Sequence, residues 1–262
     1  MIDLHVHLLP GLDDGPTTLD EAVEMCRMAQ EDGTEVLVAA PHMFNGRFDV
    51  ARRDVLAGVA SLGAALEEAD VSVSIVPAAE LGLRNDLARL IRDGEAVTLG
   101  DRGRYVLVEL GLYDTASTAT RILHEIQLAG ATPILTHPER NLEVQRNPDV
   151  LLPAILADNL VQCTAGSLLG DFGKAARRCV SELLRRRMVH AIASDAHDAV
   201  GRRPVLSRAR EVVCRLCDES EAHLLFEENP RRLLDGQPAE VSTPVRKPAG
   251  RFRELLATWW KP

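Results

Sequence analysis

The sequence alternates between short apolar runs, which are typical of buried strands, and longer stretches with the apolar spacing of amphipathic helices. Seven of the apolar runs are expected to form strands, at residues 2–7, 35–41, 71–79, 104–110, 132–136, 160–163 and 188–193. Helices are expected between them, at residues 18–30, 51–68, 116–128, 173–187 and 204–217. Because strand and helix alternate regularly, the pattern predicts an α/β fold with a parallel sheet.

The length of the chain favours one closed sheet over two separate halves. It has 262 residues, and no linker rich in Gly, Ser or Pro interrupts the alternating pattern. We therefore expect a single-domain, distorted (β/α)7 TIM-like barrel over residues 1–240, followed by a tail over residues 241–262.

Composition excludes several classes of protein. Lys and Arg total 30 against 39 Asp and Glu, so the formal net charge of −9 argues against a general nucleic-acid binder. The sequence contains neither an apolar run long enough for a transmembrane helix nor the start of a signal peptide, which predicts a cytoplasmic protein. Its five cysteines are odd in number and scattered, which indicates reduced thiols.

Metal-binding side chains follow six of the seven expected strands. The first strand carries His5 and His7, which point to the same face because side chains alternate along a strand. Later strands run into His42, Glu80, Glu109, His137 and the pair Asp195 and His197. Because the catalytic residues of such barrels lie at the carboxyl ends of the strands, these side chains are expected to converge.

The chemistry of this set indicates a metal centre. Several carboxylates and imidazoles at one barrel mouth would repel one another or stay unsatisfied without cations. Nitrogen and oxygen ligands suit Mn²⁺, Fe, Zn²⁺, Co²⁺ or Mg²⁺ in a site with several ions, and no cysteine falls at these positions.

Taken together and in order, these motifs resemble the polymerase and histidinol phosphatase (PHP) superfamily, and more narrowly its CpsB/CapC-type manganese-dependent tyrosine-protein phosphatases of capsule and exopolysaccharide loci. The resemblance runs from Met1 to about Gly236. It is carried by His5-Val6-His7, Leu12-Asp13-Asp14-Gly15, Pro41-His42, Ala79-Glu80, Val108-Glu109, Thr136-His137-Pro138-Glu139-Arg140, Ser194-Asp195-Ala196-His197 and Gly201-Arg202-Arg203-Pro204.

The resemblance implies the composition of the site. It implies three metal ions, with Mn²⁺ favoured, and the ligands His5, His7, Asp14, His42, Glu80, Glu109, His137, Asp195 and His197. It also implies phosphate-contacting arginines at Arg47, Arg140 and Arg202, with Arg203 as an alternative to Arg202. Asp195, His197 or a metal ion would assist the leaving group.

The activity that the resemblance implies is hydrolysis of protein phosphotyrosine by a hydroxide held between metal ions. The expected substrate is the phosphotyrosine-containing tail of a bacterial tyrosine kinase that controls capsular or exopolysaccharide synthesis. Two alternatives remain at this point: a small-molecule phosphatase of the histidinol-phosphatase type, and a catalytically inactive PHP module that keeps its metals for structure.

A cysteine-based phosphatase is the rival chemistry, because Cys179 and Arg185 have the spacing of a C-x₅-R loop. This segment has no glycines to cradle a phosphate, and its apolar residues suit a helix. Cys214 and Cys217 form a C-x-x-C pair inside another expected helix, so we treat both as ordinary helix residues.

The tail differs in charge from the rest of the chain. From Arg246 onward it has five basic residues and one acidic residue, together with two tryptophans at near-helical spacing with other apolar residues. Such a segment could contact an anionic membrane surface or a membrane-bound kinase. The alternative, which we favour slightly, is that it packs back on the barrel.

Overall fold

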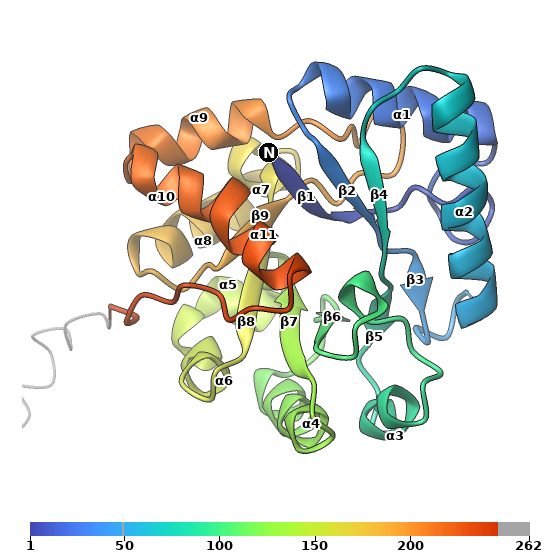
Figure 1. The fold of residues 1–262 in the computed structure, drawn as a ribbon. Coiled ribbons are helices and arrows are strands. Elements are labelled where there is room, and N and C mark those ends of the chain that lie inside the picture. The colour runs from blue at the N-terminus through green and yellow to red at the C-terminus, as the bar shows by residue number, and fades with distance from the viewer. Residues whose placement is uncertain (49, 246–262) are drawn as a thin grey trace, which may run out of the picture.

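Every strand in residues 1–48 and 50–245, the part of the chain that this computed structural model describes, runs parallel to its neighbours (Figure 1). The strands are β1 (Ile2–Val6), β2 (Val36–Ala39), β3 (His42–Met43), β4 (Ser74–Pro77), β5 (Glu80–Gly82), β6 (Tyr105–Glu109), β7 (Thr132–Thr136), β8 (Leu160–Thr164) and β9 (Ala191–Ala193). They pair in the orders β1-β2-β4 and β3-β5-β6-β7-β8-β9.

Helices follow most of the strands and cover the outside of the sheet (Figure 1). The α-helices are α1 (Leu19–Glu31), α2 (Arg52–Glu68), α3 (Leu87–Arg92), α4 (Ala116–Leu128), α5 (Leu142–Arg146), α6 (Leu152–Ile155), α7 (Ala165–Leu169), α8 (Gly173–Arg185), α9 (Ser207–Leu216), α10 (Glu219–His223) and α11 (Asn229–Leu234). Single turns occur at η1 (Leu99–Asp101), η2 (Pro138–Arg140), η3 (Pro148–Leu151) and η4 (Leu224–Glu228). None of the described helices is both long and apolar enough to cross a bilayer.

The two sheets join into one distorted barrel with seven strand positions. β3 continues the path of β2 after a short break, and β5 continues the path of β4 in the same way. Backbone hydrogen bonds connect the two chain segments at these breaks, such as the one from Ala78 N to Ala39 O at 2.9 Å. At the other edge, His7 N donates to Ala196 O at 2.9 Å, which brings the segment after β9 against the end of β1. The expected (β/α)7 architecture is therefore confirmed.

Expected and observed elements differ mainly at strand breaks. Residues 132–136 and 116–128 are a strand and a helix with the expected bounds, whereas 35–41 and 71–79 are interrupted before His42 and Glu80. Pro41 lies in the first break, where its missing N–H removes a ladder donor.

An irregularity in β1 directs His5 and the following His7 into the barrel. Its pairing with β2 shifts between Asp3 and Val6. Leu4 lies in the interior apolar cluster, but Val6 packs with the outer cluster between strands and helices. Since alternation resumes after the shift, His5 and His7 on either side of Val6 both face the interior.

The opposite, amino end of the barrel is closed by apolar side chains. Leu233 of α11 belongs to the interior cluster together with Ile2 and Leu4 of β1. Figure 1 shows α11 lying across the near end of the barrel. The segment after it remains attached through Tyr105, whose hydroxyl donates to Gln237 O at 2.7 Å.

The described part of the tail is short. Val245 N donates to Arg186 O at 2.9 Å, and Arg186 Nε donates back to Val245 O at 3.0 Å. The expected basic segment with its tryptophans, residues 246–262, lies outside the described residues, so its two alternatives both remain predictions.

Candidate metal centre

The structure brings all nine expected ligands to the carboxyl end of the barrel. Three overlapping groups of side chains, found among the described residues, have potential ligand atoms within 4.8 Å of one another. These groups are His7, Asp14, His42 and His197; His5, His7 and Glu80; and His42, Glu80 and Glu109. The remaining two residues border them: His137 Nε2 lies 2.7 Å from Glu80 Oε1, and Asp195 Oδ1 lies 3.4 Å from His7 Nε2.

His5 of β1 and His7, which directly follows β1, are held with their Nε2 atoms facing the cluster. His7 Nδ1 contacts Asp13 Oδ2 at 2.5 Å, and His5 Nδ1 contacts Gln162 Oε1 at 3.0 Å. Both partners accept, so each Nδ1 donates a proton to its partner, and each Nε2 is the ring nitrogen that faces the cluster. The two Nε2 atoms lie 3.2 Å apart, a geometry that a shared cation satisfies.

The Asp13-Asp14-Gly15 turn serves two different purposes. Asp13 points inward, where its Oδ2 also accepts from His42 N at 2.9 Å, while Asp14 Oδ1 lies 3.4 Å from His197 Nε2. A Cβ at Gly15 would lie only 2.7 Å from the carbonyl oxygen of His7. The turn can therefore approach β1 this closely only with glycine at that position.

Charges within the cluster are strongly coupled. Burial alone would raise the pKa of Glu80, but the neighbouring His5 and His137 hold it well below its usual value. Burial alone would lower the pKa of His7, but Asp13 and Asp195 raise it to about 10. Positive charge thus stabilises the ionised form of Glu80, whereas burial and the nearby Glu80 raise the pKa of Glu109.

Two buried atoms indicate where a cation fits. His42 Nδ1 and Glu80 Oε2 lie 3.0 Å apart, yet neither makes a hydrogen bond with the described residues. His197 presents a neutral imidazole, because burial and the nearby His7 lower its pKa to about 3. With oxygen ligands from Glu80, Glu109 and Asp14, the donor set fits divalent metal ions.

The backbone is strained at two of these positions. His137 and Asp195 have φ values of 34° and 53°, in the left-handed region that non-glycine residues seldom adopt. Both residues directly follow a strand or its extension at the carboxyl end. Strain of this kind concentrates at functional sites, where it aims a side chain that regular geometry would direct elsewhere.

Two of the expected arginines form one edge of the centre. Arg140 Nη2 and Arg202 Nη2 both donate to Asp195 Oδ2, the second at 2.6 Å. The Arg140 guanidinium stacks 3.6 Å from the centre of the Phe172 ring, and that of Arg202 lies 5.6 Å from it. The Nε atoms of both arginines are buried and have no hydrogen-bond partner among the described residues.

The third arginine lies at the opposite edge and is more exposed. Arg47 Nη1 is 3.4 Å from Asp14 Oδ2, and its side chain is 71% exposed. It lies 4.7 Å above the Phe48 ring, which is itself stacked on His42 at 5.7 Å. Arg203, the alternative to Arg202, makes no contact with Asp195 and lines a neighbouring pocket instead.

The structure does not support the cysteine-based alternative. Cys179 lies inside α8, where burial raises the pKa of its thiol to about 12. Arg185 is at the end of the same helix, so the C-x₅-R spacing is not a loop. Cys214 lies in α9, and neither it nor Cys217 forms a disulfide.

Three residues at the centre received no role from the sequence alone. Asp13 orients His7, Gln162 orients His5, and Phe172 lies beneath two arginines. The doubled aspartate before Gly15 was the available signal for Asp13, since two adjacent carboxylates in one turn point in different directions. For Gln162 and Phe172 the sequence contains no comparable signal.

Comparisons with known proteins agree with this geometry. Residues 1–235 match the family "Capsular polysaccharide synthesis, CpsB/CapC". Tyrosine-protein phosphatase YwqE of Bacillus subtilis is 30% identical over 90% of this chain and 92% of its own length. Putative tyrosine-protein phosphatase CapC of Staphylococcus aureus is 31% identical over 77% of this chain and 79% of its own.

Solved structures give the same result. One crystal structure superposes on this chain with a TM-score of 0.88. It comes from work on YwqE from Bacillus subtilis and CpsB from Streptococcus pneumoniae, which are described there as unique metal-dependent tyrosine phosphatases. It is 29% identical to this chain, over 94% of this chain and 100% of its own. Dihydropyrimidinase from Brevibacillus agri, with a TM-score of 0.59 and 12% identity, shares the fold alone. The chain thus belongs to the CpsB/CapC family of capsular polysaccharide synthesis proteins.

Proposed function

We propose that this protein is a metal-dependent protein-tyrosine phosphatase, with Mn²⁺ as its metal and the nine clustered residues as ligands. The observation that carries the proposal is the pair Arg140 and Arg202, which Asp195 holds together at the edge of the cluster with 19% and 35% of their side chains exposed. A phosphoryl group placed there would meet guanidinium donors on one side and the cluster on the other. Homology to proteins named tyrosine-protein phosphatases supports the same activity.

Each part of the site would have its own task. Bound metal ions would lower the pKa of a water ligand and neutralise charge on the phosphoryl oxygens. Arg140 and Arg202 would bind two further phosphoryl oxygens, and Asp195, which accepts from both, would fix their orientation. Arg47 would complete the opposite edge. Assistance to the leaving group by Asp195 or His197 stays a prediction.

The aromatic residues support an aryl phosphate as substrate. The chain has only five Phe and two Tyr, and four of the six in the described residues lie in segments at the carboxyl end of the barrel. These are Phe44 and Phe48 after β3, Tyr113 after β6 and Phe172 after α7. The phenyl ring of phosphotyrosine would pack against such rings, whereas an aliphatic phosphate gains less from them.

We further propose the phosphotyrosine-containing tail of a bacterial tyrosine kinase as the physiological substrate. The family's link to capsular polysaccharide synthesis supports this choice. All five cysteines are free, as expected in the reducing cytoplasm, where we place the protein. In this proposal residues 1–240 form the phosphatase, and residues 241–262 are a tail available for peripheral contact with a membrane or the kinase.

Phosphate release decides between the proposal and its alternatives. We expect Mn²⁺-dependent turnover of a phosphotyrosine peptide in preference to a phosphoserine peptide and histidinol phosphate. Chelator and Arg140→Ala should each abolish it. Preference for histidinol phosphate would replace the substrate and keep the metal mechanism, and no turnover of any phosphomonoester would leave an inactive metal-binding module.

A further inference from the structure

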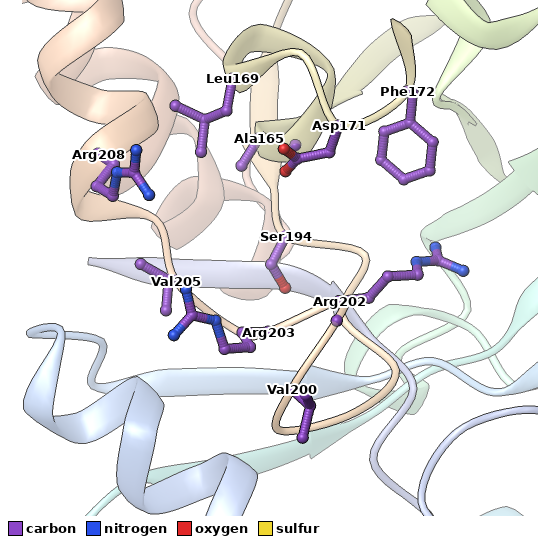
Figure 2. A pocket seen from close by; sticks show the side chains of 12 residues that line it. Ala165, Leu169, Asp171, Phe172, Ser194, Val200, Arg202, Arg203, Val205 and Arg208 are labelled. Carbon is purple, nitrogen blue, oxygen red and sulfur yellow. The ribbon is translucent and has the colours of Figure 1, made fainter.

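A separate pocket of about 220 Å³ lies beside the metal centre, on the far side of the loop that carries Arg202. Its walls come from the segment around α7, the loop after β9 and the start of α9 (Figure 2). Ser194, which lines it, directly precedes Asp195 of the metal centre, and Arg202 borders both spaces. A ligand that extends from the metal centre past this loop would therefore enter the pocket.

The pocket is basic although the protein is acidic. Arg202, Arg203 and Arg208 line it against one acidic side chain, Asp171, whereas the whole chain has a net charge of −9. Figure 2 shows Arg203 and Arg208 on one side of the pocket, while the Arg202 side chain extends away from them toward Phe172. Arg202 thus faces the phosphate edge, and the other two serve the pocket.

Both of these pocket arginines are exposed and free to bind a ligand. Within the described residues, the Arg203 and Arg208 side chains make no hydrogen bond or ion pair. They lie within six positions of Arg202, whose Nη2 is committed to Asp195. A guanidinium without a partner at the rim of an acidic enzyme attracts anions.

The remaining wall is apolar. Leu169, Val200 and Val205 line the pocket between the charged groups, and Val200 is 87% exposed. Such a surface accommodates the carbon stem of an acidic side chain whose charged end meets the arginines. A free inorganic anion would gain nothing from these residues.

From this arrangement we propose that the pocket is a second anion subsite, which binds an acidic side chain of the substrate peptide next to the phosphotyrosine. The acidic group is a carboxylate or a second phosphate. The proposal rests on the proposed phosphatase function and specifies its substrate class: peptides with a further negative charge close to the phosphotyrosine.

The test uses the full-length protein and a set of phosphotyrosine peptides of equal length. One peptide has neutral neighbours; the others carry a single glutamate or phosphoserine at one to three positions on either side. For at least one spacing we expect an acidic peptide to have a kcat/KM about tenfold above that of the neutral peptide, through a lower KM. The glutamate and phosphoserine arms show whether a carboxylate or a phosphate is preferred.

Three variants isolate the pocket. The ratio to compare is kcat/KM for the acidic peptide divided by kcat/KM for the neutral peptide. The double substitution Arg203→Gln/Arg208→Gln should reduce this ratio to a value between about 1 and 2. Asp171→Asn should raise it two- to threefold, because the opposing charge is removed. The control Arg53→Gln/Arg121→Gln removes the same charge from exposed positions on α2 and α4, away from the pocket, and should leave the ratio unchanged.

Binding supplies a readout that is independent of turnover. Peptides with a non-hydrolysable phosphonate in place of phosphotyrosine can be titrated by fluorescence anisotropy, with and without Mn²⁺, and should give the same ratios. No preference for acid at any spacing, or a preference that survives the double substitution, would overturn the subsite. If the wild type hydrolysed no phosphotyrosine peptide, the phosphatase proposal would fail, and these titrations would still decide the subsite.

Discussion

At the amino end of the barrel, Leu233 packs among apolar side chains, and the Asn229 amide donates to the backbone carbonyls of His190 and Glu240. At the carboxyl end, carboxylates and imidazoles face one another, and buried atoms such as Glu80 Oε2 make no hydrogen bond with the residues that the structure describes. The first arrangement lowers the free energy of the folded chain. The second raises it until cations bind.

This difference indicates how the molecule divides its tasks. Charged groups that would destabilise a smaller protein are tolerated at one end because the other end and the outer helices bury a large apolar core. Substitutions at the two ends should therefore separate activity from stability, and the following predictions test that separation in order of decreasing effect.

Glu80→Gln should have the largest effect, and the effect should be on activity. Glu80 Oε1 accepts from Thr136 Oγ1 at 2.6 Å, and Glu80 belongs to two of the groups that could hold metal. Glutamine keeps the size but removes the charge, so we expect kcat/KM for a phosphotyrosine peptide to fall about 10³-fold, equivalent to about 4 kcal/mol. The loss of activity is measured by phosphate release from the peptide, and circular dichroism of the variant should show an intact fold.

Cys179→Ser is the matched control for Glu80→Gln, since Cys179 is buried in α8 and belongs to none of the metal-binding groups. It should retain activity. A Glu80→Gln protein within tenfold of the wild type, or an inactive Cys179→Ser protein, would contradict the assigned chemistry.

Leu233→Ala should show the reverse pattern. The side chain is 1% exposed within the interior cluster, so truncation leaves a cavity and should lower the free energy of unfolding by about 3 kcal/mol. Urea denaturation measures the loss. Below the transition, kcat/KM should change less than twofold; a large loss of activity in the folded protein would mean that the two ends are not independent.

His190 gives the amino end a pH dependence. Burial lowers the pKa of His190 to about 4, and its Nδ1 accepts from Val161 N at 3.0 Å, a hydrogen bond that only the unprotonated nitrogen can make. An unfolded histidine takes up a proton near pH 6.5, so the neutral buried form contributes its full stability above that pH. The contribution is lost as the pH falls from 6.5 toward 4, by about 3 kcal/mol in total.

The measurement for His190 is the unfolding free energy of the metal-free protein between pH 7 and 4, compared with His190→Gln. The difference in unfolding free energy between the two proteins should change between pH 7 and 4, because the wild type loses more stability as the pH falls. Parallel curves would show that His190 is not the group responsible.

Much of the fold followed from local pattern. The strand at 132–136 and the helix at 116–128 have the expected bounds because a short apolar run and a Thr115 cap with Gly130 after the helix define them locally. The convergence of His5 and His7 with the later strand ends followed from strand periodicity and parallel topology.

Features that depend on contacts distant in sequence could not be predicted in the same way. The orientation of His5 depends on Gln162, which is 157 residues away in the sequence. The position of Phe172 depends on how α7 packs: a Cβ on Gly166 would lie 3.0 Å from its ring. Neither residue is marked by composition or spacing.

Asp13→Asn should weaken the carboxyl end more moderately than Glu80→Gln. Asp13 Oδ2 contacts His7 Nδ1, on the side of the ring away from the cluster, so asparagine would lose the charge that holds the ring in place. We expect metal affinity to fall 10- to 100-fold. The Mn²⁺ concentration for half-maximal activity should rise accordingly, with activity recovered at saturating metal; an unchanged requirement would exclude this orienting role.

Phe172→Leu should have the smallest effect, on substrate binding at the arginine edge. The Phe172 ring contacts the faces of the Arg140 and Arg202 guanidinium groups, and leucine offers no such face. We expect KM for a phosphotyrosine peptide to rise about fivefold, equivalent to about 1 kcal/mol, with kcat nearly unchanged, because Asp195 still holds both arginines. Phe172→Tyr keeps the ring and should restore the KM. If both variants raise KM equally, the effect comes from packing around Gly166 and not from the ring face, and the arginine edge is then oriented by Asp195 alone.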